Sequence, residues 1–167
     1  MIRFVKIMLV LAVASWGYVG ALHNLMDWGG TLGAVKATTS MVTFEGGTDK
    51  WQATDASWLV WLGALFIVTS KLLTALLCTI GSLKLWQKRT AESNEYNQAK
   101  VWALSGCGIA IFMLFFGFIV VAESWFELWR SDAMRGPVLG SAFRYACLIG
   151  VVALFVGQDD KSQITLK

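Results

Sequence analysis

One lysine, Lys71, stands at the middle of an otherwise uncharged apolar stretch at residues 58–83. Such a stretch can cross a bilayer, whose hydrocarbon layer needs about 20 apolar residues in a helix. A lysine at mid-depth costs about 2.5–3.5 kcal/mol on insertion scales, so its side chain must face protein or water. The other apolar stretches have no carboxylate at this depth. The sequence therefore predicts that Lys71 has no partner of opposite charge in its own chain.

Three interpretations of Lys71 follow from its position. Hydroxyls and backbone carbonyls of the neighbouring helices can satisfy its hydrogen bonds, with the amine charged or neutral. An acid or ligand supplied by another subunit can pair with it. A polar path for an ion or substrate can pass beside it.

A second group of polar residues is expected at one boundary of the bilayer, at the ends of three apolar stretches. It consists of His23, Asp27, Glu123, Glu127 and Arg144. Arg144 lies inside its stretch but can extend its guanidinium toward a glutamate at the boundary. One interpretation is a cluster of ion pairs and hydrogen bonds that locks the bundle. The other is a site for a metal ion, a lipid head group or a quinone.

The composition indicates a membrane protein. Of 167 residues, 56% are hydrophobic and only 15% are charged, against about 25% charged residues in soluble domains. Lys and Arg lie at the ends of apolar stretches rather than on one basic face, which argues against nucleic acid as a partner. Cys78, Cys107 and Cys147 stand singly within apolar stretches. Each is expected to be a buried, reduced hydrophobe.

The hydropathy pattern predicts an all-α fold, a bundle of four transmembrane helices in a single membrane domain at 1–167. The expected spans are 5–26, 58–83, 101–122 and 137–157. The basic start, apolar middle and small residues near Ala21 of the first span also fit a signal peptide, but Trp16 and Tyr18 favour a retained helix. The outer loop at 27–57, about 30 residues long, is long for a connection, and a short helix or turn is expected within 32–44.

Basic residues predict the orientation of the bundle. Lys and Arg are more numerous at the ends that carry the two termini than at the outer loop, so both termini are expected in the cytoplasm. Most of the nine tryptophans fall near the outer boundary, Trp125 and Trp129 among them. Such aromatic residues anchor helices at the interface or form contact surfaces for partners.

The segment at 123–144 has a distinctive aromatic and charged pattern. It reads Glu-Ser-Trp-Phe-Glu-Leu-Trp-Arg-Ser from Glu123, with Ala-Phe-Arg at 142–144, and the loop at 38–44 is rich in Thr and Met. This pattern, with the length and the four-span plan, resembles a family of predicted small integral membrane proteins of Gram-negative bacteria, whose function is unknown. The resemblance implies a location in the inner membrane and no known catalytic residues.

These observations lead to one favoured function and two alternatives. We expect a non-catalytic accessory or interaction subunit of a larger inner-membrane complex, because Lys71 lacks a partner, small residues line helix faces and tryptophans crowd the outer boundary. The alternatives are a small homo-oligomeric transporter or channel, and a redox or lipid-modifying enzyme subunit that uses the outer polar cluster. The sequence has none of the common nucleotide-binding or hydrolase motifs, so we expect no catalytic residue, cofactor or metal site. The expected partners are the lipid bilayer, other membrane subunits and further copies of this chain.

Overall fold

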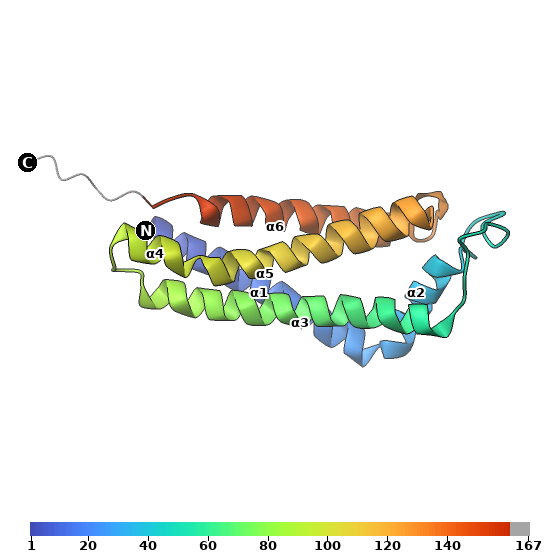
Figure 1. Ribbon diagram of the computed structural model, residues 1–167, viewed down its shortest axis with the longest axis horizontal. Helices are drawn as coiled ribbons and strands as arrows, with labels where there is room; N and C mark the ends of the chain where they lie inside the picture. The colour runs from blue at the N-terminus through green and yellow to red at the C-terminus, as the bar shows by residue number, and fades with distance from the viewer. Residues whose placement is uncertain (161–167) are drawn as a thin grey trace, which may run out of the picture.

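Four long helices lie side by side in the computed structural model of the chain, which describes residues 1–160 (Figure 1). The first two are α1 (Ile2–Met26) and α3 (Ser57–Gln87). The third rod runs over Ser93–Trp125 and the fourth over Arg135–Gly157. No strand occurs among the described residues. The expected all-α bundle of four membrane-spanning helices is thus confirmed. Lys161 and Lys167, which the orientation argument counts, lie outside the described residues.

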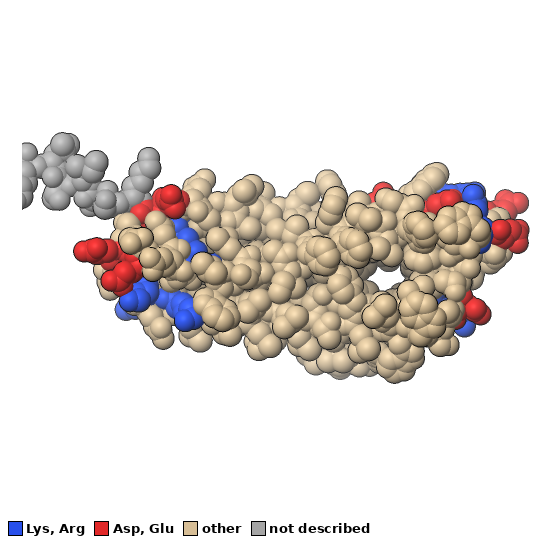
Figure 2. Space-filling view, in the orientation of Figure 1, with Lys and Arg blue, Asp and Glu red and all other residues tan. Residues whose placement is uncertain are grey.

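Charged side chains gather at the two ends of the bundle and leave an uncharged surface between them (Figure 2), on which many large hydrophobic side chains are exposed. One end holds the start of α1, the short helix α4 (Ser93–Ala99) and the end of α6 (Ser141–Gly157); we call it the α4 end. The other holds α2 (Trp28–Thr39) and the loop that follows it; we call it the α2 end. This distribution suits a protein whose middle is solvated by lipid rather than water.

Small residues allow the long helices to approach closely. A Cβ placed on Gly17 of α1 would lie 2.7 Å from the carbonyl oxygen of Lys71, so the two backbones are in contact there. A Cβ on Gly81 of α3 would lie 2.5 Å from the backbone nitrogen of Ala103. Ala142 of α6 is also buried, at 3% exposed. These small residues therefore let helices of the same chain pack closely.

The third rod changes its helical type along its length. It continues from α4 into α5 (Val101–Phe112) and then into the π-helix η1 (Met113–Trp125). The amide of Phe126 donates to the carbonyl of Val121, five residues back, at 3.0 Å. Wider π-turns occur frequently at functional sites. The fourth rod likewise begins with a π-helix, η3 (Arg135–Gly140), before α6.

The long connection between α1 and α3 is structured rather than extended. Asp27 begins α2, because its carboxylate accepts a hydrogen bond from the amide of Gly30 at 3.0 Å. The helix therefore starts four residues before the region at 32–44, in a glycine-rich part of the sequence that helix propensity disfavours. After α2 the chain forms turns, and a hydrogen bond of 2.8 Å from the Thr54 amide to the Thr39 carbonyl closes them.

Candidate functional site

Lys71 has a hydrogen-bond partner within its own chain. Its Nζ donates to Asn24 Oδ1 at 2.5 Å and to the carbonyl of Gly20 at 3.4 Å, both on α1. The prediction that this lysine lacks a partner of opposite charge stands for the described residues, where no carboxylate pairs with it. The interpretation in which uncharged oxygens of the neighbouring helices satisfy Lys71 agrees best with this geometry, since both acceptors are neutral oxygens of α1. Pairing with an acid or ligand from another subunit stays a prediction.

The packing of α1 against α3 explains how Lys71 reaches Asn24. Gly20 of α1 faces the lysine stem, and a Cβ there would lie 3.2 Å from its Cδ. With only hydrogen at Gly20, the stem runs along α1 toward the α2 end and places the ammonium near Asn24, close to the end of the helix. Sequence reasoning overlooked Asn24 because it searched for polar groups level with the lysine backbone. A lysine side chain is long enough to place its charge more than one helical turn away.

Asn24 connects Lys71 to the start of the outer loop. Its Nδ2 donates to the hydroxyl of Thr31 at 2.9 Å, and that hydroxyl donates to the carbonyl of Asn24 at 3.1 Å. Thr31 belongs to α2 and is buried. The row Lys71–Asn24–Thr31 thus joins three helices, and Asn24 uses both its amide oxygen and its amide nitrogen.

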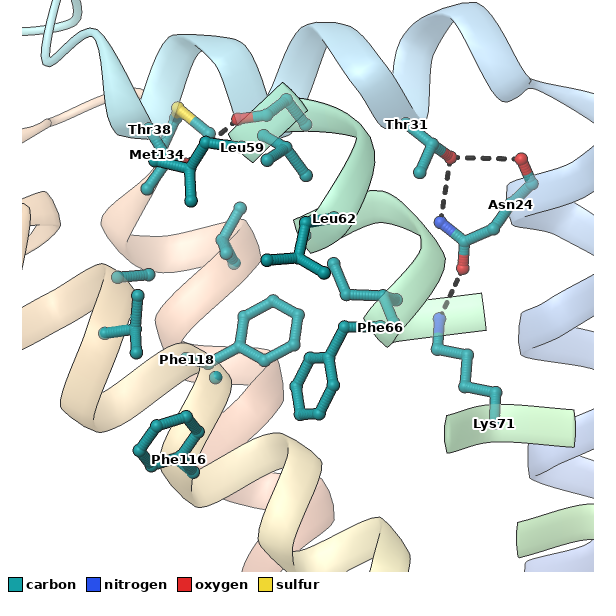
Figure 3. Close-up of a pocket in the computed structure, with 18 residues that line it drawn as sticks. Asn24, Thr31, Thr38, Leu59, Leu62, Phe66, Lys71, Phe116, Phe118 and Met134 are labelled. Carbon is teal, nitrogen blue, oxygen red and sulfur yellow. Dashed lines mark hydrogen bonds between the residues drawn. The ribbon is translucent and has the colours of Figure 1, made fainter. Parts of the chain in front are cut away.

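This polar row forms one side of a cavity of about 490 Å³. The remaining wall is predominantly apolar (Figure 3). It includes Leu62 and Phe66 of α3 and Phe116 and Phe118 of η1. Leu62 and Phe116 are also exposed on the surface of the bundle, and Figure 2 shows an opening through the molecule near the α2 end. The cavity is therefore continuous with the face that contacts lipid, and its volume lies within the range of about 300–1,000 Å³ typical of small-molecule sites.

The predicted outer polar cluster does not assemble as one site. Glu127 pairs with Arg130 at 3.0 Å and with Lys50 at 3.6 Å, and the hydrogen bond from Arg130 holds the pKa of this carboxyl below its ordinary value. Asp27 caps α2, and Arg144 donates from Nε to the carbonyl of Gly140 at 3.2 Å.

The other predicted site residues at this end lie apart from one another. Within residues 1–160, His23 and Glu123 take part in no ion pair, and no group of three metal-ligating side chains occurs. The ring of Trp125 packs edge-on against that of Trp51 at 5.2 Å, and Trp129 is exposed. Cys78 and Cys107 are buried as expected, but Cys147 is exposed, because it lies on the face of α6 that no other helix covers.

A buried charge cluster at the α4 end was not predicted. Asp160, which follows α6, accepts hydrogen bonds through Oδ2 from Lys6 at 2.8 Å and from Lys100 at 2.7 Å. The two lysine side chains are only 2% and 3% exposed, and that of Asp160 is 8% exposed. Burial raises the pKa of Asp160, but the hydrogen bonds from Lys100 and Lys6 lower it by more, so the carboxyl has a pKa below its ordinary value. The sequence places Lys6 and Lys100 at the ends of spans, where lysines are typical interface anchors. Only the structure shows that both side chains converge on Asp160.

Comparison with protein families gives a match over residues 2–159, nearly the whole chain, to the family described as predicted small integral membrane protein (DUF2165). The chain belongs to this family. The resemblance to a family of predicted small integral membrane proteins is thereby confirmed, whereas its restriction to Gram-negative bacteria stays a prediction. The protein is a small integral membrane protein of a family whose function is unknown. Neither the curated proteins nor the solved structures include a match to the chain. The description of the DUF2165 family names no activity.

Proposed function

We propose that this protein is a non-catalytic membrane protein that binds an amphipathic molecule with an anionic head group in the cavity beside Lys71. The supporting observation is the environment of the lysine. Its ammonium faces an otherwise apolar cavity, and its acceptors are an amide oxygen and a backbone carbonyl. A buried charge of this kind is costly unless an opposite charge joins it. An anionic ligand supplies that charge.

The geometry defines where each part of such a ligand fits. Lys71 has three N–H donors and uses two of them within the described part of the chain, which leaves one for a ligand oxygen. A carboxylate at this point forms a charge-assisted hydrogen bond, which is stronger than a neutral one. The hydrocarbon chain then lies along the aromatic side, between Phe66 and Phe116 (Figure 3). A single-chain carboxylate such as a fatty acid meets both requirements and can enter from the bilayer.

The test compares two ligands that differ only in the head group. Purified protein in detergent is titrated with hexadecanoate and with hexadecanol, and binding is followed by native mass spectrometry. Hexadecanoate is expected to bind at least tenfold more tightly, the equivalent of about 1.4 kcal/mol. Lys71→Met should remove this preference while weaker binding of both ligands persists. The control is Lys84→Met, which removes an exposed lysine of the same helix outside the cavity.

Equal affinity of the native protein for the two ligands would contradict the proposal. So would a preference for hexadecanoate that survives Lys71→Met in a variant that remains folded. If Lys71→Met fails to fold, Lys71→Gln keeps a hydrogen-bond donor near Asn24 without the charge and answers the same question.

An accessory role in a larger membrane complex is our second candidate. One of its original reasons is weakened, because Lys71 donates a hydrogen bond to Asn24 of its own chain. The exposed tryptophans at the α2 end still favour an accessory role, since Trp51 and Trp58 are 82% and 70% exposed. Native mass measured after mild extraction tests this role, since co-purifying chains of a different sequence support it and a lone 18.4 kDa chain counts against it.

The location and orientation are also proposals. We infer an inner-membrane protein with both termini in the cytoplasm, which the excess of Lys and Arg at the α4 end supports. This orientation places the Lys71 cavity in the outer half of the bilayer. No separate structural observation favours the transporter or channel, or the redox or lipid-modifying enzyme subunit.

A further inference from the structure

A second hollow, of about 490 Å³, lies at the opposite end of the bundle from the Lys71 cavity. It sits between the start of α1 and the turn that follows α3. Its polar wall combines two arginines, Arg3 and Arg89, with two hydroxyls, Thr90 and Ser93. The apolar side chains of Ile2 and Phe4 form its other wall, and a carboxylate oxygen of Asp160 lies at its edge.

Positive charge exceeds negative charge around this hollow. Arg3, Lys6 and Lys100 all converge on Asp160, and the contact from Arg3 Nε is the longest of the three, at 3.7 Å. Arg89 pairs with no carboxylate among residues 1–160. Among the described residues, the one carboxylate that lines the hollow is therefore shared among three cations, and an added anion would reduce the remaining positive charge.

The unused donors suit a phosphate group. Arg89 donates one hydrogen bond, from Nη1 to the carbonyl of Trp86 at 2.9 Å, and its guanidinium lies 4.3 Å from the centre of that tryptophan ring. Its Nη2 and Nε hydrogens have no acceptor within the described part of the chain. A stacked guanidinium with free donors is the arrangement that binds phosphate through two parallel hydrogen bonds. The Thr90 hydroxyl offers a further donor to the same hollow.

An apolar surface adjoins the polar hollow. Phe4, which lines it, is 52% exposed and packs against Trp86, 44% exposed, with ring centroids 6.3 Å apart. These two rings lie on the side of the bundle that faces lipid. A molecule with a phosphate in the hollow can therefore place hydrocarbon chains against them. Basic pockets that join transmembrane helices at this boundary bind anionic lipid head groups.

We propose that this hollow binds the head-group phosphate of an anionic phospholipid, with its acyl chains against Phe4 and Trp86. The site is separate from the Lys71 cavity and does not depend on the function proposed for it. Asp160 opposes the anion only weakly, because Lys6 and Lys100 already neutralise its carboxylate.

The experiment titrates the detergent-purified full chain with phosphatidylglycerol and with phosphatidylcholine of the same acyl chains, followed by native mass spectrometry. Phosphatidylglycerol is expected to bind more tightly. Arg89→Gln should weaken its binding about fivefold, the loss expected for one basic residue at an anionic lipid surface. The matched control is Lys88→Gln, which removes the neighbouring cation that pairs with Glu95 at 2.5 Å and does not line the hollow.

Three results would overturn this assignment. They are equal affinity for the two lipids, equal loss in Arg89→Gln and Lys88→Gln, and thermal stabilisation by inorganic phosphate alone that matches the stabilisation by phosphatidylglycerol. The third result would indicate a site for a soluble anion instead of a lipid. Lys71→Met is expected to retain the preference for phosphatidylglycerol, so failure of one site is distinguishable from failure of the other.

Discussion

The buried charge cluster at the α4 end allows a quantitative prediction about stability. Asp160→Asn keeps the size and one oxygen of the side chain but removes the only carboxylate among residues 1–160 that contacts Lys6 and Lys100. Both ammonium groups are at most 3% exposed, so water cannot replace the lost charge without a rearrangement. Breaking a buried ion pair by removing one partner costs about 3–5 kcal/mol. We expect the lower end, about 3 kcal/mol, because both lysines keep their hydrogen bonds to the carbonyl of Gln158.

The assay is thermal unfolding in detergent micelles. At about 2–4 °C per kcal/mol for a chain of this size, the midpoint should fall by about 6–12 °C. Asp159→Asn is the matched control, because Asp159 is the adjacent residue, is exposed and forms no ion pair among the described residues. Its midpoint should stay close to that of the native protein.

A second substitution tests the electrostatic explanation directly. Lys6→Met in the Asp160→Asn background removes one of the two unpaired ammonium groups. Part of the lost stability should therefore return, even though the double variant has none of the three native ion pairs to Asp160. The reasoning is refuted if Asp160→Asn and Asp159→Asn unfold at the same temperature. It is also refuted if the double variant is less stable than Asp160→Asn alone.

Two further predictions concern the contact between α1 and α3 and the charge cluster around Asp160. Gly17→Ala should lower the unfolding midpoint far more than Gly20→Ala. The new Cβ at Gly17 would lie 2.7 Å from the backbone carbonyl oxygen of Lys71, whereas the new Cβ at Gly20 would lie 3.2 Å from the flexible Lys71 side chain. Thermal unfolding of both variants checks this difference. Stability should also fall in acid, because the pKa of Asp160 is lowered in the folded protein. Its contribution is complete above the unfolded pKa of about 3.9 and is lost as the pH falls through the lower folded value, so Asp160→Asn should show less acid sensitivity than the native protein.

Much of the architecture follows from local properties of the sequence. Continuous apolar runs of about 20 residues satisfy their backbone hydrogen bonds in lipid as helices, whereas barrel strands are shorter and alternate apolar with polar residues, so the four long helices and the all-α class were predictable. Other features depend on atoms that meet across the bundle. The change from α5 to the π-helix η1 has no signal in the continuous apolar run at 113–122, which has no polar residue to show which face is buried. The helix at Trp28–Thr39 forms despite three glycines, because Asp27 caps it and Thr31 bonds to Asn24.

The candidate sites show the same division. The sequence by itself determined that Lys71 lies in a membrane span and that no carboxylate of the neighbouring spans matches its depth. Only the tertiary structure decided that the side chain extends past Gly20 to Asn24 and faces a cavity, because the direction of a long side chain depends on which neighbouring residue leaves room. Likewise, Asp160 lies more than 150 residues from Lys6 in the chain, and the fold alone brings them together. Composition fixes which solvent the helices require, whereas packing fixes which polar groups share the interior.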